Sequence, residues 1–354
     1  VISSAIKKNN PELIKAKKDV LLIEAGSSYS LDSCKSYSTL EMEQKYKYGG
    51  LTPTLGNPKI PYIEGRCLGG GSEINSGFYH RTPKSILSHW EKKYRIKEFS
   101  SEKLNKHFGV IEDEISVSRM PNPGLISKAS LKLKEGAERL GWDSMEVPRW
   151  YKYKDNNKGI KQSMTNTHIK WYQDRGGKIL INTLAKKIQF KKNSWIISCI
   201  DLESNQRSLI MTKYVFICGG AINTPFLLRS SGIKNNIGNT LQMHPTIKVV
   251  AEFNEVINFH DMGVPVHQVN EFSPDLNFGC SISSKPFLAL AMLDNEKYLK
   301  NIETKWEKMA IYYASIKPMG IGKIRKIPFF NDPFVKYKIT DRDLMRLSDA
   351  LKKL

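Results

Sequence analysis

A run of glycines between Gly65 and Gly77 constrains this chain more than any other segment. Its sequence is GRCLGGGSEINSG, in which three consecutive glycines precede a serine. Glycine destabilises the interior of a helix or strand, because it loses the most backbone entropy on folding and has no side chain to bury. Because glycine has no side chain, the backbone N–H groups of this run are accessible to a ligand. The segment therefore predicts a turn that lies close to a phosphate or an electron-rich ring of a ligand.

Two further segments combine a buried strand with glycine. Residues 20–26 read VLLIEAG, an apolar run that ends in Glu24 and a glycine. An acid at the carboxyl end of a parallel strand is placed to accept hydrogen bonds from two ribose hydroxyls. Residues 215–225 read VFICGGAINTP, and they predict a strand over 214–218 that returns to the same sheet and breaks into a turn and a helix. Pro225 suits the first turn of that helix.

In this order, the three segments resemble the glucose–methanol–choline (GMC) family of FAD-dependent oxidoreductases. The resemblance rests on IEAG, GRCLGGGSEINSG and GGAINTPFLLRSSGI, followed by IGNTLQMHP, and it runs over about residues 20–354. It implies an α/β fold in which an FAD-binding, Rossmann-like sheet domain is interleaved with an antiparallel-sheet substrate domain. We expect residues 1–84 and 178–243 in the FAD-binding domain, 85–177 in a mostly helical insertion, and 244–354 in the substrate domain.

The resemblance also implies which residues bind the cofactor. They are Glu24, Gly69, Gly70, Gly71, Ser72, Asn75, Gly77, Gly219, Gly220, Ala221, Asn223 and Thr224. Some family members attach FAD covalently through a histidine at the position that Ile74 occupies here. An aliphatic side chain cannot form that bond, so we expect FAD to bind non-covalently. A strand-end acid that caps a turn, and glycine turns of purely structural purpose, are the competing interpretations.

The activity that the resemblance implies is oxidation of the CH–OH group of an alcohol. Hydride passes to flavin N5, a histidine takes the hydroxyl proton, and oxygen, a quinone or a cytochrome reoxidises the flavin. The family carries a G-x-G-x-x-G turn before its acid and its catalytic histidine near its C-terminal end, and neither is found between Val1 and Leu354. We therefore expect an internal fragment without catalytic residues that does not oxidise alcohols alone. His244, in QMHP, is interpreted as fixing the entry to the second domain.

The charge of the chain raises a different class of partner. Its formal net charge is +20, from 55 Lys and Arg against 35 Asp and Glu. The excess of positive charge comes mostly from scattered lysines. Bidentate recognition of phosphate and guanine uses arginine, so we expect no nucleic-acid partner. Two alternatives stay open beside the oxidoreductase. One is a GMC-fold lyase that keeps FAD without net redox change, and the other is a basic binding module with a degenerate nucleotide fold.

The cysteines and the apolar runs limit location and metal binding. The five cysteines form no C-x-x-C pair and no zinc spacing, which favours a reducing, cytoplasmic compartment and predicts no metal site. Cys199 and Cys218 lie in apolar runs and are expected to be buried. No apolar run reaches the roughly 18–20 residues of a membrane span.

Periodicity predicts the remaining elements. We expect helices over 3–18, 126–140 and 338–354, antiparallel strands over 178–183, 187–190 and 195–201, further strands over 246–253, 263–270, 278–284 and 309–316, and a surface excursion over 27–57. Trp306, Tyr312 and Tyr313 are expected either in the core or against the substrate.

Overall fold

Helices and short strands alternate along the chain, and the predicted α/β class is confirmed. The computed structural model describes residues 19–354 except 123, 125, 155–158, 260–262 and 294, so the helix expected over 3–18 lies outside the described residues. The α-helices are α3 (Thr39–Lys45), α4 (Gly71–Ile74), α5 (Lys84–Tyr94), α6 (Ser101–Glu114), α7 (Lys128–Arg139), α8 (His168–Asp174), α9 (Gly220–Ser230), α10 (Lys285–Ala291), α11 (Lys300–Lys305) and α12 (Asp341–Lys353).

The strands form six sheets among the described residues. Two sheets position the candidate site: the pair β1 (Leu21–Ile23) and β8 (Lys178–Leu180), and the five-stranded sheet β12 (Thr246–Glu252), β15 (Met309–Ile316), β14 (Leu276–Ser281), β13 (His267–Val269) and β5 (Ser144–Glu146). The others are β9 (Thr183–Lys191), β10 (Ser194–Asp201) and β11 (Arg207–Thr212); β4 (Val117–Ser118), β6 (Arg149–Lys152) and β7 (Ile160–Lys161); β2 (Thr52–Pro53) and β3 (Pro61–Tyr62); and β16 (Lys323–Arg325) and β17 (Phe334–Lys336).

Strand β1 pairs in parallel with β8, with Leu22 opposite Ile179. The sequence correctly predicted β1, but its expectation of an antiparallel strand over 178–183 was wrong. The alternation of apolar residues marks a strand and not its direction, which is set by the partner that the fold supplies. Because the pair is parallel, Glu24 and the end of β8 lie at the same edge. The N–H of Glu24 donates to Leu180 O at 2.8 Å.

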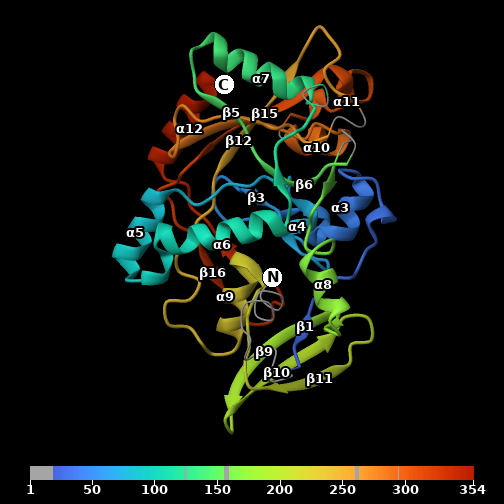
Figure 1. Ribbon diagram of the computed structural model, residues 1–354, viewed down its shortest axis with the longest axis vertical. Coiled ribbons are helices and arrows are strands. Elements are labelled where there is room, and N and C mark those ends of the chain that lie inside the picture. The colour runs from blue at the N-terminus through green and yellow to red at the C-terminus, as the bar shows by residue number, and fades with distance from the viewer. Residues whose placement is uncertain (1–18, 123, 125, 155–158, 260–262, 294) are drawn as a thin grey trace.

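The sheet of β9, β10 and β11 is antiparallel and forms one end of the molecule (Figure 1). The antiparallel strands expected over 187–190 and 195–201 fall in β9 and β10, whereas β11 was not predicted. A two-residue turn joins β9 to β10, with φ of +47° at Lys192 and +62° at Asn193. Two positive φ values in succession match the twist of a hairpin and favour asparagine. Cys199 is buried in this sheet, as predicted.

Helices cover one apolar face of the five-stranded sheet. Helices α7 and α12 pack on it, and Figure 1 shows both at the end of the molecule opposite β9–β11. Phe278, Ala314 and Val269 of the sheet are buried with Ala137 of α7 and Ala350 of α12. On the opposite face, among the residues that the structure describes, α10 packs at one end, where Val250 and Ile311 join the core around Leu288 of α10.

Residues 214–218 do not form the strand that the sequence predicted. Tyr214 and Phe216 are each 62% exposed, and Cys218 is exposed rather than buried. An apolar run becomes a strand only where a neighbour satisfies its backbone N–H and C=O groups, and no described strand lies beside this one. The segment instead lines the cavity described below.

Residues 27–57 are more than a surface excursion, so that expectation was also wrong. They contain α3, whose N-cap Ser38 accepts a hydrogen bond from the Glu41 N–H at 3.2 Å. Met42 and Tyr46 are buried in the same core as Trp306 of the C-terminal half. Because the segment is mostly polar, the sequence did not predict this helix, which has one buried face.

Helix α12 begins at a capping box formed by Thr340 and Asp343. The Asp343 carboxylate also accepts hydrogen bonds from the N–H groups of Met319 at 2.8 Å and Gly320 at 2.9 Å. Burial raises the pKa of Asp343, but these bonds favour the ionised form and hold the pKa below its usual value.

We expect the Asp343 carboxylate to make stability depend on pH. A carboxyl whose pKa is lower in the folded state stabilises the protein above its unfolded pKa of about 4, and this contribution is lost as pH falls through the folded pKa. Urea unfolding should therefore show the wild type losing free energy of unfolding between about pH 5 and pH 3 more steeply than Asp343→Asn. The exposed Asp349→Asn variant is the control, and equal slopes for all three proteins would contradict the assignment.

Candidate functional site

One cavity of about 3280 Å³ joins the glycine-rich segments to the five-stranded sheet. Drug-sized ligand sites are smaller, at about 300–1,000 Å³. Its walls come from the end of β1, the turn before α4, the start of α9 and the uncovered face of the sheet. The cavity has room for an extended cofactor together with a second molecule.

Backbone without side chains forms one wall of the cavity, at the turn before α4. Gly69 and Gly70 have φ of +93° and +56°, which glycine adopts without strain. The Gly70 N–H donates to Cys67 O at 2.8 Å and closes the turn. A Cβ at Gly70 or Gly71 would meet no atom within 4 Å, although both residues line the cavity. These glycines therefore leave open the space that a side chain would fill.

Glu24 lies at the carboxyl edge of the β1–β8 pair and also lines the cavity. Its Oε1 accepts a hydrogen bond from the Gly26 N–H at 2.7 Å. Burial raises the pKa of Glu24, while the N–H groups of Gly26 and Ala25 and the charge of Arg66 oppose that rise. The carboxylate is held by the turn that follows β1, and it faces the same space as the glycines.

The start of α9 supplies the wall on the other side. Gly219, Gly220 and Ala221 line the cavity, and Gly220 has a φ of +75°. A Cβ at Gly220 would meet nothing within 4 Å, as at the first glycine turn. Thr224 lies in α9 but is not part of the lining.

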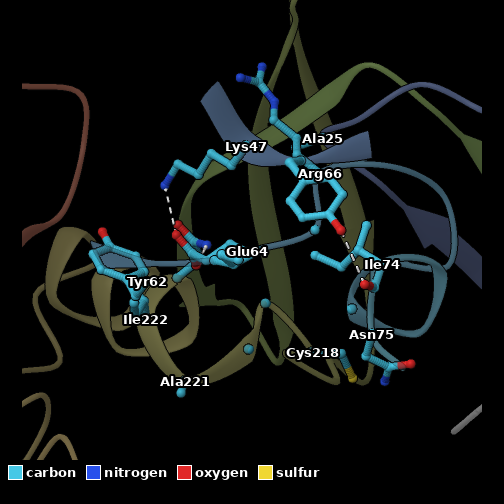
Figure 2. A pocket seen from close by; sticks show the side chains of 18 of the residues that line it. Ala25, Lys47, Tyr62, Glu64, Arg66, Ile74, Asn75, Cys218, Ala221 and Ile222 are labelled. Carbon is cyan, nitrogen blue, oxygen red and sulfur yellow. Dashed lines mark hydrogen bonds and ion pairs between the residues drawn. The ribbon is translucent and has the colours of Figure 1, made fainter. Parts of the chain in front are cut away.

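Figure 2 shows how these segments surround the pocket. Ala25 and Arg66 lie on one side, and Ala221, Cys218 and Asn75 lie on the opposite side. The three sequence segments, which are far apart along the chain, thus meet around one space.

Asn223 uses its side chain to hold the walls together. Its Nδ2 donates to Glu64 Oε1 at 2.8 Å. The other oxygen of Glu64 pairs with Lys47 Nζ at 3.2 Å, one of the contacts drawn in Figure 2. Glu64 and Lys47 were not singled out in the sequence, because they become neighbours of α9 only through the fold.

Ser72 and Gly77 support the turn from behind the lining, whereas Asn75 lines the cavity. Ser72 Oγ donates to Gly69 O at 2.8 Å and accepts from the Met164 N–H at 3.0 Å. The Gly77 N–H donates to Asn75 Oδ1 at 3.0 Å. These bonds fix the backbone path that the glycines follow.

A second network that the sequence did not reveal holds the same turn. Glu73 accepts hydrogen bonds from the hydroxyls of Ser163 and Thr165, each at 3.0 Å. Lys161 Nζ donates to Glu73 O at 3.2 Å and also to Asn75 O. Burial lowers the pKa of Lys161 to about 8, with the Glu73 charge opposing. Residues 161–165 carry no local motif, so only their tertiary position identifies them.

The uncovered face of the five-stranded sheet forms the far wall of the cavity. Tyr313 lines it, whereas Tyr312 and Trp306 are buried in the core. His244 lines the cavity just before β12, and His80 lines it near the sheet. Burial lowers the pKa of His80, and a hydrogen bond with the Gln268 side chain raises it.

Metal-binding clusters and membrane-spanning helices were also sought among the described residues. They contain no group of three or more His, Cys, Asp and Glu side chains arranged to hold a metal ion. Within the same part of the chain, no helix combines the length and apolar character needed to cross a membrane. All five cysteines are free thiols.

Comparisons with known proteins agree on one family. The family model described as GMC oxidoreductase matches residues 42–246, more than half of the chain. The Uncharacterized GMC-type oxidoreductase y4nJ of Sinorhizobium fredii is 33% identical over 344 residues, which cover 94% of this chain and 68% of that protein. The Long-chain-alcohol oxidase FAO4B of Arabidopsis thaliana is 24% identical and covers 96% of this chain, but the chain spans only 48% of its length.

A solved structure shows the same fold. The crystal structure of pyridoxine 4-oxidase from Mesorbium loti superposes with a TM-score of 0.72 at 15% identity, and the match covers 99% of this chain and 76% of that one. The sequence resemblance, the fold and the matched region all point the same way. The chain belongs to the GMC oxidoreductase family.

Proposed function

We propose that this chain binds FAD non-covalently and serves the oxidation of the CH–OH group of an alcohol. The observation that carries the proposal is the meeting of Glu24 and two bare-glycine turns around one cavity. The family supports an oxidoreductase, and the relatives named as a long-chain-alcohol oxidase and a pyridoxine 4-oxidase support an alcohol as substrate.

The residues present fit a dinucleotide. A Cβ at Gly70, Gly71 or Gly220 would enter the open space of the cavity, so the backbone there is available for close approach by phosphates or a ring. Glu24 offers a carboxylate for ribose hydroxyls at the carboxyl edge of a parallel pair. We propose that these residues hold FAD and that the sheet wall of residues 244–354 faces the substrate.

When bound, FAD supplies the hydride acceptor for the oxidation. The chain's own residues orient the cofactor, and the polar face of the five-stranded sheet receives the alcohol. We propose a histidine outside residues 1–354 as the base that takes the hydroxyl proton. Oxygen, a quinone or a cytochrome is the proposed final electron acceptor.

The experiment that tests this function is anaerobic addition of alcohols to the FAD-loaded protein in a form that includes the proposed histidine base, because residues 1–354 alone are expected not to oxidise alcohols. We expect the visible absorbance of oxidised flavin to bleach and the matching aldehyde to form. A protein that keeps FAD but is bleached by no alcohol, and instead cleaves a carbon–carbon bond, would support the lyase alternative. A folded protein that ignores FAD and binds DNA with steep salt dependence would support the basic binding module.

We expect the flavin to leave the protein on acid precipitation, because Ile74 stands where a covalent attachment would need a nucleophilic side chain. The yellow colour should appear in the supernatant, and its absorbance should account for the flavin bound before precipitation. Colour that stays with the washed pellet would contradict non-covalent binding.

We expect Glu24→Ala to weaken FAD binding by roughly 1.5–3 kcal/mol, the range for hydrogen bonds to a charged group. Calorimetric titration of FAD into wild type and variant measures the difference. Glu43→Ala, which removes an exposed acid of α3, is the control and should leave the affinity unchanged. An unchanged FAD affinity in Glu24→Ala would show that the acid only caps the turn after β1.

A further inference from the structure

The backbone just after the first glycine turn is held from behind the cavity wall. Lys161 Nζ, on β7, donates to Glu73 O at 3.2 Å and also to Asn75 O. The hydroxyl of Tyr46 donates to Ile74 O, the carbonyl between them, at 3.3 Å. The last carbonyls of a helix have no partner within the helix. At the end of α4, three such carbonyls in succession therefore accept hydrogen bonds from side chains of other segments.

The peptide between Asn75 and Ser76 connects this support to the cavity. It is trans, since the cis peptides of the described residues lie elsewhere, and the C=O and N–H groups of a trans peptide point in opposite directions. Asn75 and Ser76 line the cavity, whereas Lys161 does not. The carbonyl that Lys161 holds therefore points behind the wall, and the Ser76 N–H points to the cavity side. Among the described residues, this N–H has no hydrogen-bond partner.

Lys161 brings a positive charge to this peptide. Burial lowers its pKa to about 8, with the charges of Glu73 and Glu41 opposing the shift and that of Lys45 adding to it, so the amine is an ammonium group at pH 7. Glu41 pairs with Lys45 at 3.4 Å, and the hydrogen bonds of Lys161 go to backbone carbonyls. A charged donor on a carbonyl polarises the peptide, which makes the N–H at the other side of the peptide a stronger donor.

A structural cap for α4 would not need a cation. Burying an ammonium group costs more free energy than burying a neutral donor. The neutral hydroxyl of Tyr46 already serves Ile74 O in the same stretch of backbone. A charge placed directly behind the one peptide whose N–H is free on the cavity side therefore points to a function in the cavity.

We propose that Lys161 is a positioning residue that directs the Ser76 N–H at bound FAD and favours the reduced form of the cofactor. This proposal rests on the proposed FAD binding and adds a residue that adjusts the reduction potential. Reduction adds negative charge to the flavin ring, and a preorganised, polarised N–H stabilises negative charge more than it stabilises a neutral ring. Lys161 acts through the Asn75–Ser76 peptide and does not itself contact the cofactor.

The test is an anaerobic reductive titration of the FAD-loaded protein with dithionite beside a reference dye, followed by absorbance. In Lys161→Met, we expect the ratio of the affinities for reduced and oxidised FAD to fall by about tenfold, the difference between a hydrogen bond to a charged group and one to a neutral group. For a two-electron couple this moves the potential about 30 mV more negative.

Two further variants separate charge from substitution. Lys161→Arg keeps the positive charge and should stay closer to the wild-type potential than Lys161→Met. Lys152→Met is the matched control, because Lys152 is exposed on the neighbouring strand β6 and does not line the cavity. Its potential should equal that of the wild type. Thermal unfolding verifies that each variant is folded. If Lys161→Met does not fold, Lys161→Gln, which keeps a neutral donor, takes its place with the same expected shift.

The outcomes separate this proposal from the proposed function. A folded Lys161→Met or Lys161→Gln protein with the wild-type potential overturns the proposal, even if its FAD affinity falls equally for both oxidation states, because the lysine is then only a structural cap. A shifted potential in a protein that oxidises no alcohol supports the role of Lys161 and contradicts the alcohol oxidation. A folded wild-type protein that binds no FAD contradicts both.

Discussion

Replacing Gly71 with leucine is expected to remove detectable FAD binding while leaving the protein folded. Gly71 opens α4, has an ordinary negative φ, and would direct a Cβ into space where no atom lies within 4 Å. That space belongs to the cavity. A leucine side chain therefore costs the fold little but occupies the volume that the cofactor needs. We expect FAD affinity to fall by at least about 100-fold, which corresponds to roughly 2.7 kcal/mol.

A matched glycine controls for the substitution itself. Gly109 lies in α6, also has open space around its Cβ position, and does not line the cavity. Gly109→Leu should bind FAD like the wild type, and circular dichroism should show both variants folded. A Gly71→Leu protein that is folded and retains wild-type FAD affinity would show that the cofactor does not approach this turn.

Replacing Gly26 with alanine is expected to damage the fold itself. A Cβ at Gly26 would lie 2.2 Å from Arg66 O and 2.5 Å from the Cys67 nitrogen, and both are backbone atoms that cannot rotate away. At this contact the chain after β1 meets the glycine turn, with the Leu68 N–H donating to Ser27 O at 2.9 Å. The two backbones must separate to admit a methyl group, so we expect a loss of about 3 kcal/mol in the free energy of unfolding.

Urea unfolding measures this loss as a lower midpoint. Gly136→Ala is the control, because Gly136 lies within α7 and a Cβ there meets nothing within 4 Å. Alanine has a higher helix propensity than glycine, so this variant should be as stable as the wild type or slightly more stable. A Gly26→Ala protein with an unchanged midpoint would contradict the close approach of the two segments.

Much of the fold was predictable from local patterns. The strand over 309–316 and the helix within 338–354 were located from periodicity alone. The predictions that were wrong concerned which strands pair and in which direction. The direction of β8 depends on β1, far away in the sequence, and residues 214–218 have strand composition but no described strand beside them. Local propensity predicts that a segment suits a strand, and only a neighbour makes it one.

The candidate site divides in the same way. The glycine turns and Glu24 were visible in the sequence, because bare backbone and a strand-end acid leave local marks. The polar face of the five-stranded sheet was not visible. Lys248, Gln268 and Tyr313 share a face only through the registers of β12, β13, β14 and β15. Side chains of ordinary type, brought together by pairing across a sheet, carry no motif.

The central claim is that the end of β1, the first glycine turn and the start of α9 hold one FAD together. Hydrogen–deuterium exchange of the purified protein, with and without saturating FAD, tests this claim most directly. We predict slower exchange in residues 24–26, 68–75 and 219–223, and unchanged exchange in α6 and α7, which do not line the cavity. Saturable FAD binding that protects none of these three segments, or a folded protein that shows no FAD-dependent protection, would contradict it.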